Sequence, residues 1–313
     1  MKITKKQHYV SKFYLKAWIV DKKENLFCLR DNKIFLSNII NLAQERYFYE
    51  IKEINDKEID FLKRIIFQNK NSELVKSMLS VIRTSNRIFK LIEIANYLEK
   101  YDSEKIEDLF KKELKEHHEN YFGEIENKAS PLFEKLIKGD KGFLNDYENK
   151  KFFLLHTVGQ YLRTKSMKEN LKKEIENLKK EIENIKKKVE NICIENIFTV
   201  IVIYFSIQLA SNINENNYNI VFIKNLTDKY FITSDQPVIN IWKAKNPEKK
   251  KIEDIELYMP ITPKLGILIS KNIYHDLEIS KVEELEEYNN YIVSSSLEQI
   301  FSNNKEQLEY YKS

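Results

Sequence analysis

His8 is the first residue whose type suggests chemistry. It stands in Lys5–Trp18, "KKQHYVSKFYLKAW". Histidine ionises closest to neutral pH of the common side chains, so His8 could act as a general acid or base. A His-Tyr pair could equally anchor the leading segment, and we expect the aromatics around it to dock the N-terminus onto the body of the protein: Tyr9, Phe13, Tyr14 and Trp18.

A second polar group ends an apolar run in "FITSDQPVINIW", at Thr233, Ser234 and Asp235. Pro237 biases the residue before it towards extended or turn structure. Hydroxyls and a carboxylate at the end of a strand are well placed to line a cleft. Asp235 could instead close a turn through its own side chain, which is a common role for aspartate.

A third group lies in "FFLLHTVGQYLRT", which has a helical pattern. His156 falls on an apolar face, where a core histidine with a hydrogen-bond partner is the usual outcome. Gln160 and Arg163 follow on a similar face, and Thr164 comes next. An arginine can bind a phosphate through two parallel hydrogen bonds.

Familiar cofactor and metal motifs are missing from the sequence. With five glycines, the chain has no phosphate-binding loop and no dinucleotide fingerprint, and it has neither a G-x-S-x-G elbow nor a Cys-x-x-Cys pair. We therefore expect no cofactor and no metal.

The residue patterns around these groups predict the helices and strands that must position them. Together they predict an α+β fold: a predominantly helical body with a long heptad-bearing helix and a small C-terminal β-sheet. Two β-like runs, "NLFCLR" and "KIFLSN", flank Asp31-Asn32 and predict a hairpin. Asn55 and Glu58 have the spacing of a capping box, and a final helix is expected from Ser280 to about Ser302. The expected divisions are 1–54, 55–213 and 214–313, within one integrated domain.

Heptad spacing marks the segment 168–192, where apolar residues alternate at intervals of four and three: Leu171, Ile175, Leu178, Ile182, Ile185, Val189 and Ile192. Such a seam can pack within one monomer. It can also form a protruding coiled coil that makes a homodimer or binds a protein partner through Leu171–Ile192. Three heptads are too few to decide between these alternatives.

Composition sets the compartment that we expect. The net charge is only +4, which by itself does not indicate nucleic-acid binding. Cys28 and Cys193 indicate reduced thiols, and the N-terminus lacks an apolar signal region, so we expect a cytoplasmic protein. The longest apolar run, Ile197–Ala210, is shorter than the roughly 20 residues that a membrane span needs, and we expect it in the core with no membrane association.

Several motifs together resemble a large, mainly bacterial family that is catalogued as a domain of unknown function and opens with a His-Tyr-Val-Pro signature. The matching stretches are "QHYVSKFYLKAW", "NLAQERYFYE", "VGQYLRTKSMKENL", "YFITSDQPV" and "YMPITPKLGILIS". The sequence departs from the family pattern at four places. Ser11 stands where the pattern has proline, Lys12 where it has glutamine, Trp18 where it has phenylalanine, and Ile261-Thr262 where it has Leu-Ser. The Ser11 change removes a fixed φ and restores an N–H.

The resemblance implies that polar residues of these separated motifs meet at one site. The candidate catalytic residues are His8, Asp235 and Arg163. The candidate substrate-binding residues are Tyr9, Gln160, Thr164, Thr233 and Ser234.

Two functions remain open. The first is a nucleic-acid-directed enzyme, such as a metal-independent RNase in bacterial defence or mobile-element conflict, with RNA or another nucleic acid as partner. His8 would then transfer protons, Asp235 would orient it, and Arg163 would clamp the phosphate. The second is a non-enzymatic interaction or inhibitor protein, in phage defence or an anti-CRISPR context, in which the same polar residues form a buried structural network.

Overall fold

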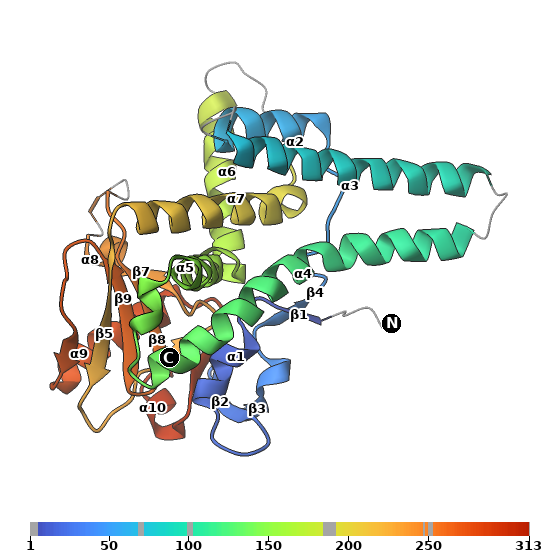
Figure 1. The fold of residues 1–313 in the computed structure, drawn as a ribbon. Helices are drawn as coiled ribbons and strands as arrows, with labels where there is room; N and C mark the ends of the chain where they lie inside the picture. The colour runs from blue at the N-terminus through green and yellow to red at the C-terminus, as the bar shows by residue number, and fades with distance from the viewer. Residues whose placement is uncertain are drawn as a thin grey trace. The chain divides into compact units, whose positions relative to one another are not determined.

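The chain divides into two compact units, which the computed structural model describes over residues 6–67, 72–98, 103–183, 192–246, 248–249 and 253–312. Unit 1 comprises Met1–Gln7, Arg46–Glu124 and Lys168–Ile207, and unit 2 comprises His8–Glu45, Ile125–Met167 and Gln208–Ser313. Figure 1 labels the elements. The successive segments 1–54, 55–213 and 214–313 stay a prediction.

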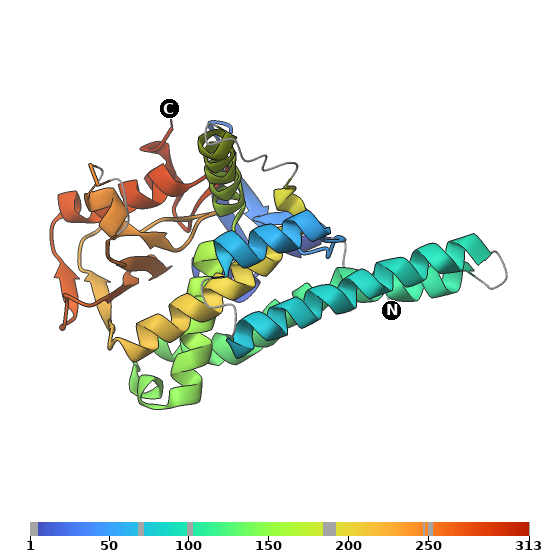
Figure 2. The ribbon, with the colours of Figure 1, turned by 90° about the horizontal axis from the view of Figure 1, so that it is seen from above.

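Unit 1 is built from helices. They are α2 (Asp56–Phe61) with the π-helical turn η3 (Leu62–Ile66), α3 (Glu73–Leu98), and parts of α4 (Ser103–Ile137), α6 (Lys165–Glu183) and α7 (Ile194–Glu215). The last three helices continue into unit 2. Within unit 1, α3 and the first part of α4 extend alongside each other (Figures 1 and 2).

The expected capping box begins α2. The Asn55 side chain accepts from the Glu58 N–H at 3.0 Å, and the Glu58 carboxylate accepts from the Asn55 N–H at 2.9 Å. The other Glu58 oxygen accepts from the Cys193 N–H and from Asn196, at 3.1 and 3.0 Å. This carboxylate is fully buried, so it also ties α2 to the beginning of α7.

The apolar run expected in the core lies in α7, and its residues Ile197, Phe198 and Ile201 are buried. Among the described residues, α7 is the one helix long and apolar enough to cross a bilayer, and 61% of its apolar window is buried within the protein. The core helix of a soluble protein passes the same test.

The heptad segment is helical as far as Glu183, within α6. Ile175 of the expected seam is buried. Residues 184–191 of the segment lie outside the described residues, so the dimerising coiled coil stays a prediction.

Unit 2 contains two sheets, which confirm the α+β class. One has the order β3 (Lys33–Asn38), β2 (Asn25–Arg30), β11 (Ile300–Ser302) and β6 (Thr233–Ser234), with all neighbours antiparallel. The other has the order β10 (Leu277–Ile279), β5 (Asn219–Asn225), β9 (Leu265–Ser270), β8 (Leu257–Thr262) and β7 (Ile239–Asn240). The N-terminal hairpin therefore shares its sheet with strands from the C-terminal third of the chain.

The hairpin between β2 and β3 forms as expected. Asp31 and Asn32 have φ values of 50° and 58°, as the two central residues of a type I′ turn require. Asparagine and aspartate tolerate this left-handed conformation better than most residues. The turn is therefore encoded by the Asp-Asn pair itself.

The remaining elements are short, apart from α5 and α9: β1 (Lys6–His8), α1 (Lys12–Leu15), η1 (Lys16–Trp18), η2 (Ile39–Asn41), β4 (Gln44–Arg46), η4 (Gly142–Asn145), α5 (Tyr147–Leu162), α8 (Ile241–Lys245), α9 (Val282–Ser295) and α10 (Lys305–Glu309). The expected final helix to about Ser302 is wrong at both ends. It begins at Val282 and stops at Ser295, because Ile300–Ser302 pair with β2 and β6 instead.

Candidate functional site

Arg163 lies in a polar network of unit 2. It follows α5, and its side chain is 2% exposed. Its Nη2 donates to the Glu126 carboxylate on α4 and to Ser11 Oγ, the latter at 2.7 Å. The Glu126 side chain is 27% exposed, so the network reaches solvent at this carboxylate. The expected grip of Arg163 on a phosphate would require these bonds to break.

Ser11 connects the leading segment to both helices. Its Oγ lies 2.9 Å from Glu126 Oε1 and 2.9 Å from His156 Nε2. Its N–H donates to Gln160 Oε1 at 3.1 Å, while Gln160 Nε2 donates to the Tyr9 carbonyl at 2.6 Å. Ser11 has a φ of −60°, which is the angle that a proline would impose. The backbone at Ser11 is therefore compatible with a proline, and the N–H that a proline would lack makes a buried hydrogen bond.

The network sets the charge of its two titratable members other than arginine. Burial opposes ionisation of Glu126, but the Arg163 guanidinium and the hydrogen bonds from Arg163 and Ser11 lower the pKa of this carboxyl below its ordinary value. Burial and the nearby Arg163 charge lower the pKa of His156 to about 3. At neutral pH the network therefore holds a carboxylate, a guanidinium and a neutral imidazole. His156 is a core histidine with a partner at Nε2, as expected.

His8 lies next to this network and is partly exposed. Its Nδ1 is 3.1 Å from the Leu42 carbonyl. A carbonyl only accepts, so this contact assigns the ring proton to Nδ1 and makes Nε2 the basic atom. Burial and the Lys12 charge lower the pKa of His8 to about 4, while Glu126 acts to raise it. His8 is therefore a neutral imidazole with a fixed tautomer at neutral pH.

The aromatic residues of the leading segment are anchors, as expected. Tyr9, Tyr14 and Trp18 are at most 2% exposed. The Phe13 ring packs against Phe133 and against His156, with centroids 5.4 and 4.9 Å apart. This packing holds the backbone on either side of Ser11.

Asp235 stands in a different arrangement from the expected one. Its Oδ1 accepts from the Leu297 N–H at 2.9 Å, and its Oδ2 accepts from the N–H groups of Glu298 and Gln299 at 2.8 and 3.1 Å. Burial raises the pKa of Asp235 to about 6, although these three bonds act to lower it. The carboxylate fixes the segment that leads into β11, and none of its hydrogen bonds goes to His8. The Asp235 side chain therefore does not close a turn with its own neighbours, which was the alternative that the sequence left open; it fixes a segment more than 60 positions away instead.

The neighbouring hydroxyls are also bonded within the protein. Tyr14 OH lies 2.6 Å from Thr233 Oγ1 and donates to the Pro260 carbonyl at 2.6 Å. Ser234 Oγ accepts from the Gln236 N–H at 3.0 Å, and Thr164 Oγ1 donates to the Gln236 side-chain oxygen. Each of these hydroxyls is buried, so the strand end does not line a cleft.

The structure thus divides the predicted site residues between two clusters of unit 2. The first cluster contains His8, Tyr9, Gln160 and Arg163. The second cluster contains Thr164, Thr233, Ser234 and Asp235. Sequence reasoning missed Glu126 because it is one of many glutamates in a Lys/Glu-rich helix. It noted Ser11 only as a departure from proline, although that departure was the available signal.

Within the described part of the chain, no group of three or more His, Cys, Asp or Glu side chains is placed to hold a metal ion. No curated protein and no solved structure matches the chain. The model of one family, described as protein of unknown function (DUF4238), matches residues 6–306. The match covers nearly the whole chain, across all the elements that form the two clusters. The chain therefore belongs to the DUF4238 family.

Proposed function

We propose that this protein is a nucleic-acid-directed enzyme that cleaves RNA without a metal, with His8 as its general base. We also propose that two segments of this chain correspond to signatures of the family. Gln7–Ser11 corresponds to the His-Tyr-Val-Pro signature, and Phe231–Val238 corresponds to the Phe-x-Thr-Ser-Asp-x-Pro-Val strand. The observation that carries the function is the state of His8: a partly exposed, neutral imidazole whose Nδ1 is held by a backbone carbonyl. In this tautomer Nε2 carries the basic lone pair of the ring.

The chemistry follows from that tautomer. Nε2 of His8 takes the proton of a ribose 2′-hydroxyl, and the 2′-oxygen forms a bond to phosphorus. The bond from phosphorus to the 5′-oxygen breaks, the 5′-oxygen takes a proton from water, and a 2′,3′-cyclic phosphate remains. The step needs no oxidant and no metal.

Glu126 replaces Asp235 as the supporting carboxylate in this proposal. Its charge acts to raise the pKa of His8, so it stabilises the imidazolium that forms when His8 accepts a proton. Arg163 keeps Glu126 ionised. Arg163 is therefore a positioning residue, and Asp235 serves the fold.

The test is cleavage of labelled single-stranded RNA by the full chain in the presence of EDTA, with His8→Asn as the variant. An asparagine amide can still donate to the Leu42 carbonyl but cannot act as a base. We expect cleavage to fall by about 10²–10⁴-fold, with products of the wild type ending in a 2′,3′-cyclic phosphate. His275→Asn is the matched control, because His275 is exposed in a loop of the same unit.

Equal cleavage by His8→Asn and wild type, or cleavage that requires Mg²⁺, would overturn this assignment. A thermal unfolding curve for each variant separates loss of chemistry from loss of fold.

The burial of Arg163 and Asp235 favours a second candidate, a non-enzymatic interaction or inhibitor protein. Here the two clusters only hold the fold together, and binding belongs to another surface such as the heptad segment. Absence of cleavage by wild type across single-stranded and structured RNAs, with His8→Asn still folded, supports this candidate over the enzyme.

A further inference from the structure

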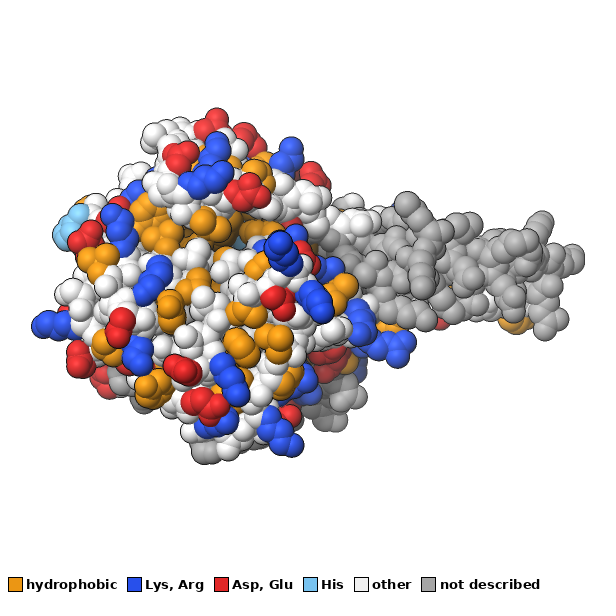
Figure 3. All heavy atoms as spheres, turned by 90° about the horizontal axis from the view of Figure 1, so that it is seen from below, with side chains coloured by type: hydrophobic (Ala, Val, Ile, Leu, Met, Phe, Trp, Pro, Cys, Tyr) orange, Lys and Arg blue, Asp and Glu red, His pale blue; other side chains and the backbone are white. Residues whose placement is uncertain are grey.

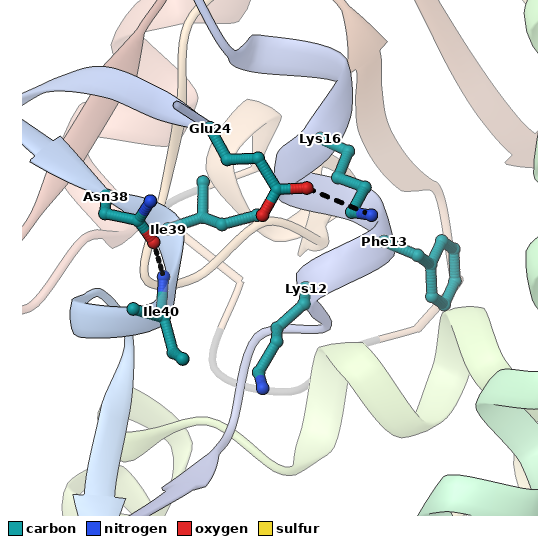
Figure 4. Close-up of a pocket in the computed structure, with 7 residues that line it drawn as sticks. All are labelled: Lys12, Phe13, Lys16, Glu24, Asn38, Ile39 and Ile40. Carbon is teal, nitrogen blue, oxygen red and sulfur yellow. Dashed lines mark hydrogen bonds and ion pairs between the residues drawn. The ribbon is translucent and has the colours of Figure 1, made fainter. Parts of the chain in front are cut away.

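An open hollow of about 620 Å³ lies on unit 2, beside the segment that carries His8. One side consists of α1 and η1, with Lys12 and Lys16, and the other consists of η2 and its flanks, with Asn38, Ile39 and Ile40. Figure 4 shows the Lys12 side chain on the same side as η2, whereas the Phe13 ring points away from it. The hollow is therefore bounded by two amines, the Glu24 carboxylate, the Asn38 amide and aliphatic groups.

The two lysines differ in their partners. Lys16 forms an ion pair with Glu24 at 3.2 Å. Lys12 is exposed, and no carboxylate in the described parts of the chain is paired with its amine. Lys12 is therefore the cation in this hollow that can take an anion without breaking an existing pair.

The charge in the hollow is a local feature. Figure 3 shows one face of the molecule, on which basic and acidic side chains are interspersed. The net charge of the chain is +4 over 52 basic and 48 acidic residues, too small for a general attraction to polyanions. Binding of a nucleic acid would depend on particular lysines.

Lys12 also connects the hollow to His8, because its charge acts on the His8 imidazole. A phosphate that binds Lys12 would lie within electrostatic range of the proposed base. On the far side of the hollow, Ile40 is 52% exposed and offers an apolar contact for a sugar or base edge. The hollow can thus accept one phosphate together with the nucleoside attached to it.

We infer that this hollow is a nucleotide subsite, in which Lys12 binds the phosphate next to the one that reacts and Ile40 contacts its nucleoside. The inference rests on the proposed function for the identity of the substrate. It adds a residue and a surface that the proposed chemistry does not use.

The experiment measures binding separately from cleavage. A fluorescent single-stranded RNA with 2′-O-methyl groups, which cannot be cleaved by 2′-oxygen attack, is titrated against wild type and Lys12→Met at several salt concentrations. We expect Lys12→Met to bind at least fivefold more weakly at about 0.1 M salt. The plot of log K against log salt should become less steep, and the magnitude of its slope should decrease by about 0.7, the value for one phosphate contact to a single strand.

Lys33→Met is the matched control. Lys33 is an exposed lysine at the beginning of β3, the strand whose last residue, Asn38, lines the hollow. Lys33 itself does not line the hollow, so its loss should change affinity by less than twofold. Ile40→Ser should weaken binding without changing the salt slope.

The outcomes are separable. If Lys12→Met and Lys33→Met bind alike while His8→Asn has lost cleavage, the subsite is wrong and the proposed function stands. If binding depends on Lys12 but wild type cleaves no RNA, the subsite stands and the function fails. If polyglutamate binds as tightly as RNA and with the same dependence on Lys12, the hollow is a site for acidic protein segments and the inference is overturned.

Discussion

Two carboxylates of unit 2, the half-buried Glu126 and the buried Asp235, do similar work by different means. Glu126 and Asp235 each hold segments that are far apart in the sequence. Glu126 does so through a guanidinium and a hydroxyl, those of Arg163 and Ser11. Asp235 does so through three backbone N–H groups at residues 297–299. Among the described residues, Glu126 has a counterion and Asp235 has none.

This difference gives the two groups opposite shifts in pKa. Burial raises the pKa of both, but at Glu126 the Arg163 charge and the hydrogen bonds from Arg163 and Ser11 together outweigh burial, and the pKa falls below its ordinary value. At Asp235 the three dipoles do not outweigh burial, and the pKa rises to about 6. A full positive charge compensates for lost hydration better than peptide dipoles do. The Glu126 cluster should therefore depend on its ion pair, and the Asp235 cluster on hydrogen-bond geometry.

Removal of Arg163 should have the largest effect. Arg163→Met keeps much of the volume but leaves the Glu126 carboxylate without its counterion, which typically costs about 3–5 kcal/mol of stability when the charge is buried. Because Glu126 is partly exposed, we expect the lower end of that range. Urea unfolding at pH 7 measures the change.

The double variant Arg163→Met/Glu126→Gln is the control for charge. If the stranded carboxylate causes the loss, the double variant should be more stable than Arg163→Met alone. A double variant that is less stable would show that Arg163 acts through packing, and the comparison with Asp235 would lose its basis.

How far the sequence predicts this site depends on the range of the signal. The hairpin turn at Asp31-Asn32 and the capping box at Asn55 were predictable because each is encoded within four residues. The aromatic anchors were predictable because large rings are rarely left in water.

The partners of His8 and Asp235 were not predictable in the same way. Asp235 binds backbone amides that lie more than 60 positions away, and any residue type supplies an amide. Glu126 resembles every other glutamate on its helix until the fold places Arg163 beside it. Ser11 was noted because it restores an N–H, a donor that a buried segment must satisfy, but the sequence does not show that Gln160 is the partner.

Asp235→Asn should have an intermediate effect at pH 7. The amide keeps one acceptor oxygen, but its NH₂ group replaces the other oxygen and faces N–H donors of the 297–299 segment. Loss of such bonds in a buried site costs about 1–3 kcal/mol. Asp228→Asn, at an exposed position of the same unit, is the control and should stay within about 0.5 kcal/mol of wild type. Equal stability of the two variants would mean that the three hydrogen bonds contribute nothing net.

The smallest effect is the pH dependence of the Asp235→Asn penalty, and it separates the two carboxylates most directly. A pKa of about 6 in the folded state, against 3.8 for the ordinary group, means that the folded protein holds this proton more tightly than the unfolded chain does. The stabilisation of the folded protein by the protonated Asp235 carboxyl is complete below pH 3.8 and is lost as the pH rises through 6. Between pH 5 and pH 7 wild type should lose about 1 kcal/mol from this group, a loss that Asp235→Asn cannot show.

The penalty of Asp235→Asn, measured by urea unfolding, should therefore be about 1 kcal/mol smaller at pH 7 than at pH 5. His8 and His156, whose lowered pKa values make the protein less stable as the pH falls below 6.5, are present in both proteins and cancel in the difference. For Glu126→Gln the penalty should change in the opposite direction or stay constant over this range, because the pKa of Glu126 is lowered. If the Asp235→Asn penalty grew with pH, the three amides would hold Asp235 ionised as Arg163 holds Glu126. Peptide dipoles would then compensate for burial as well as a guanidinium does.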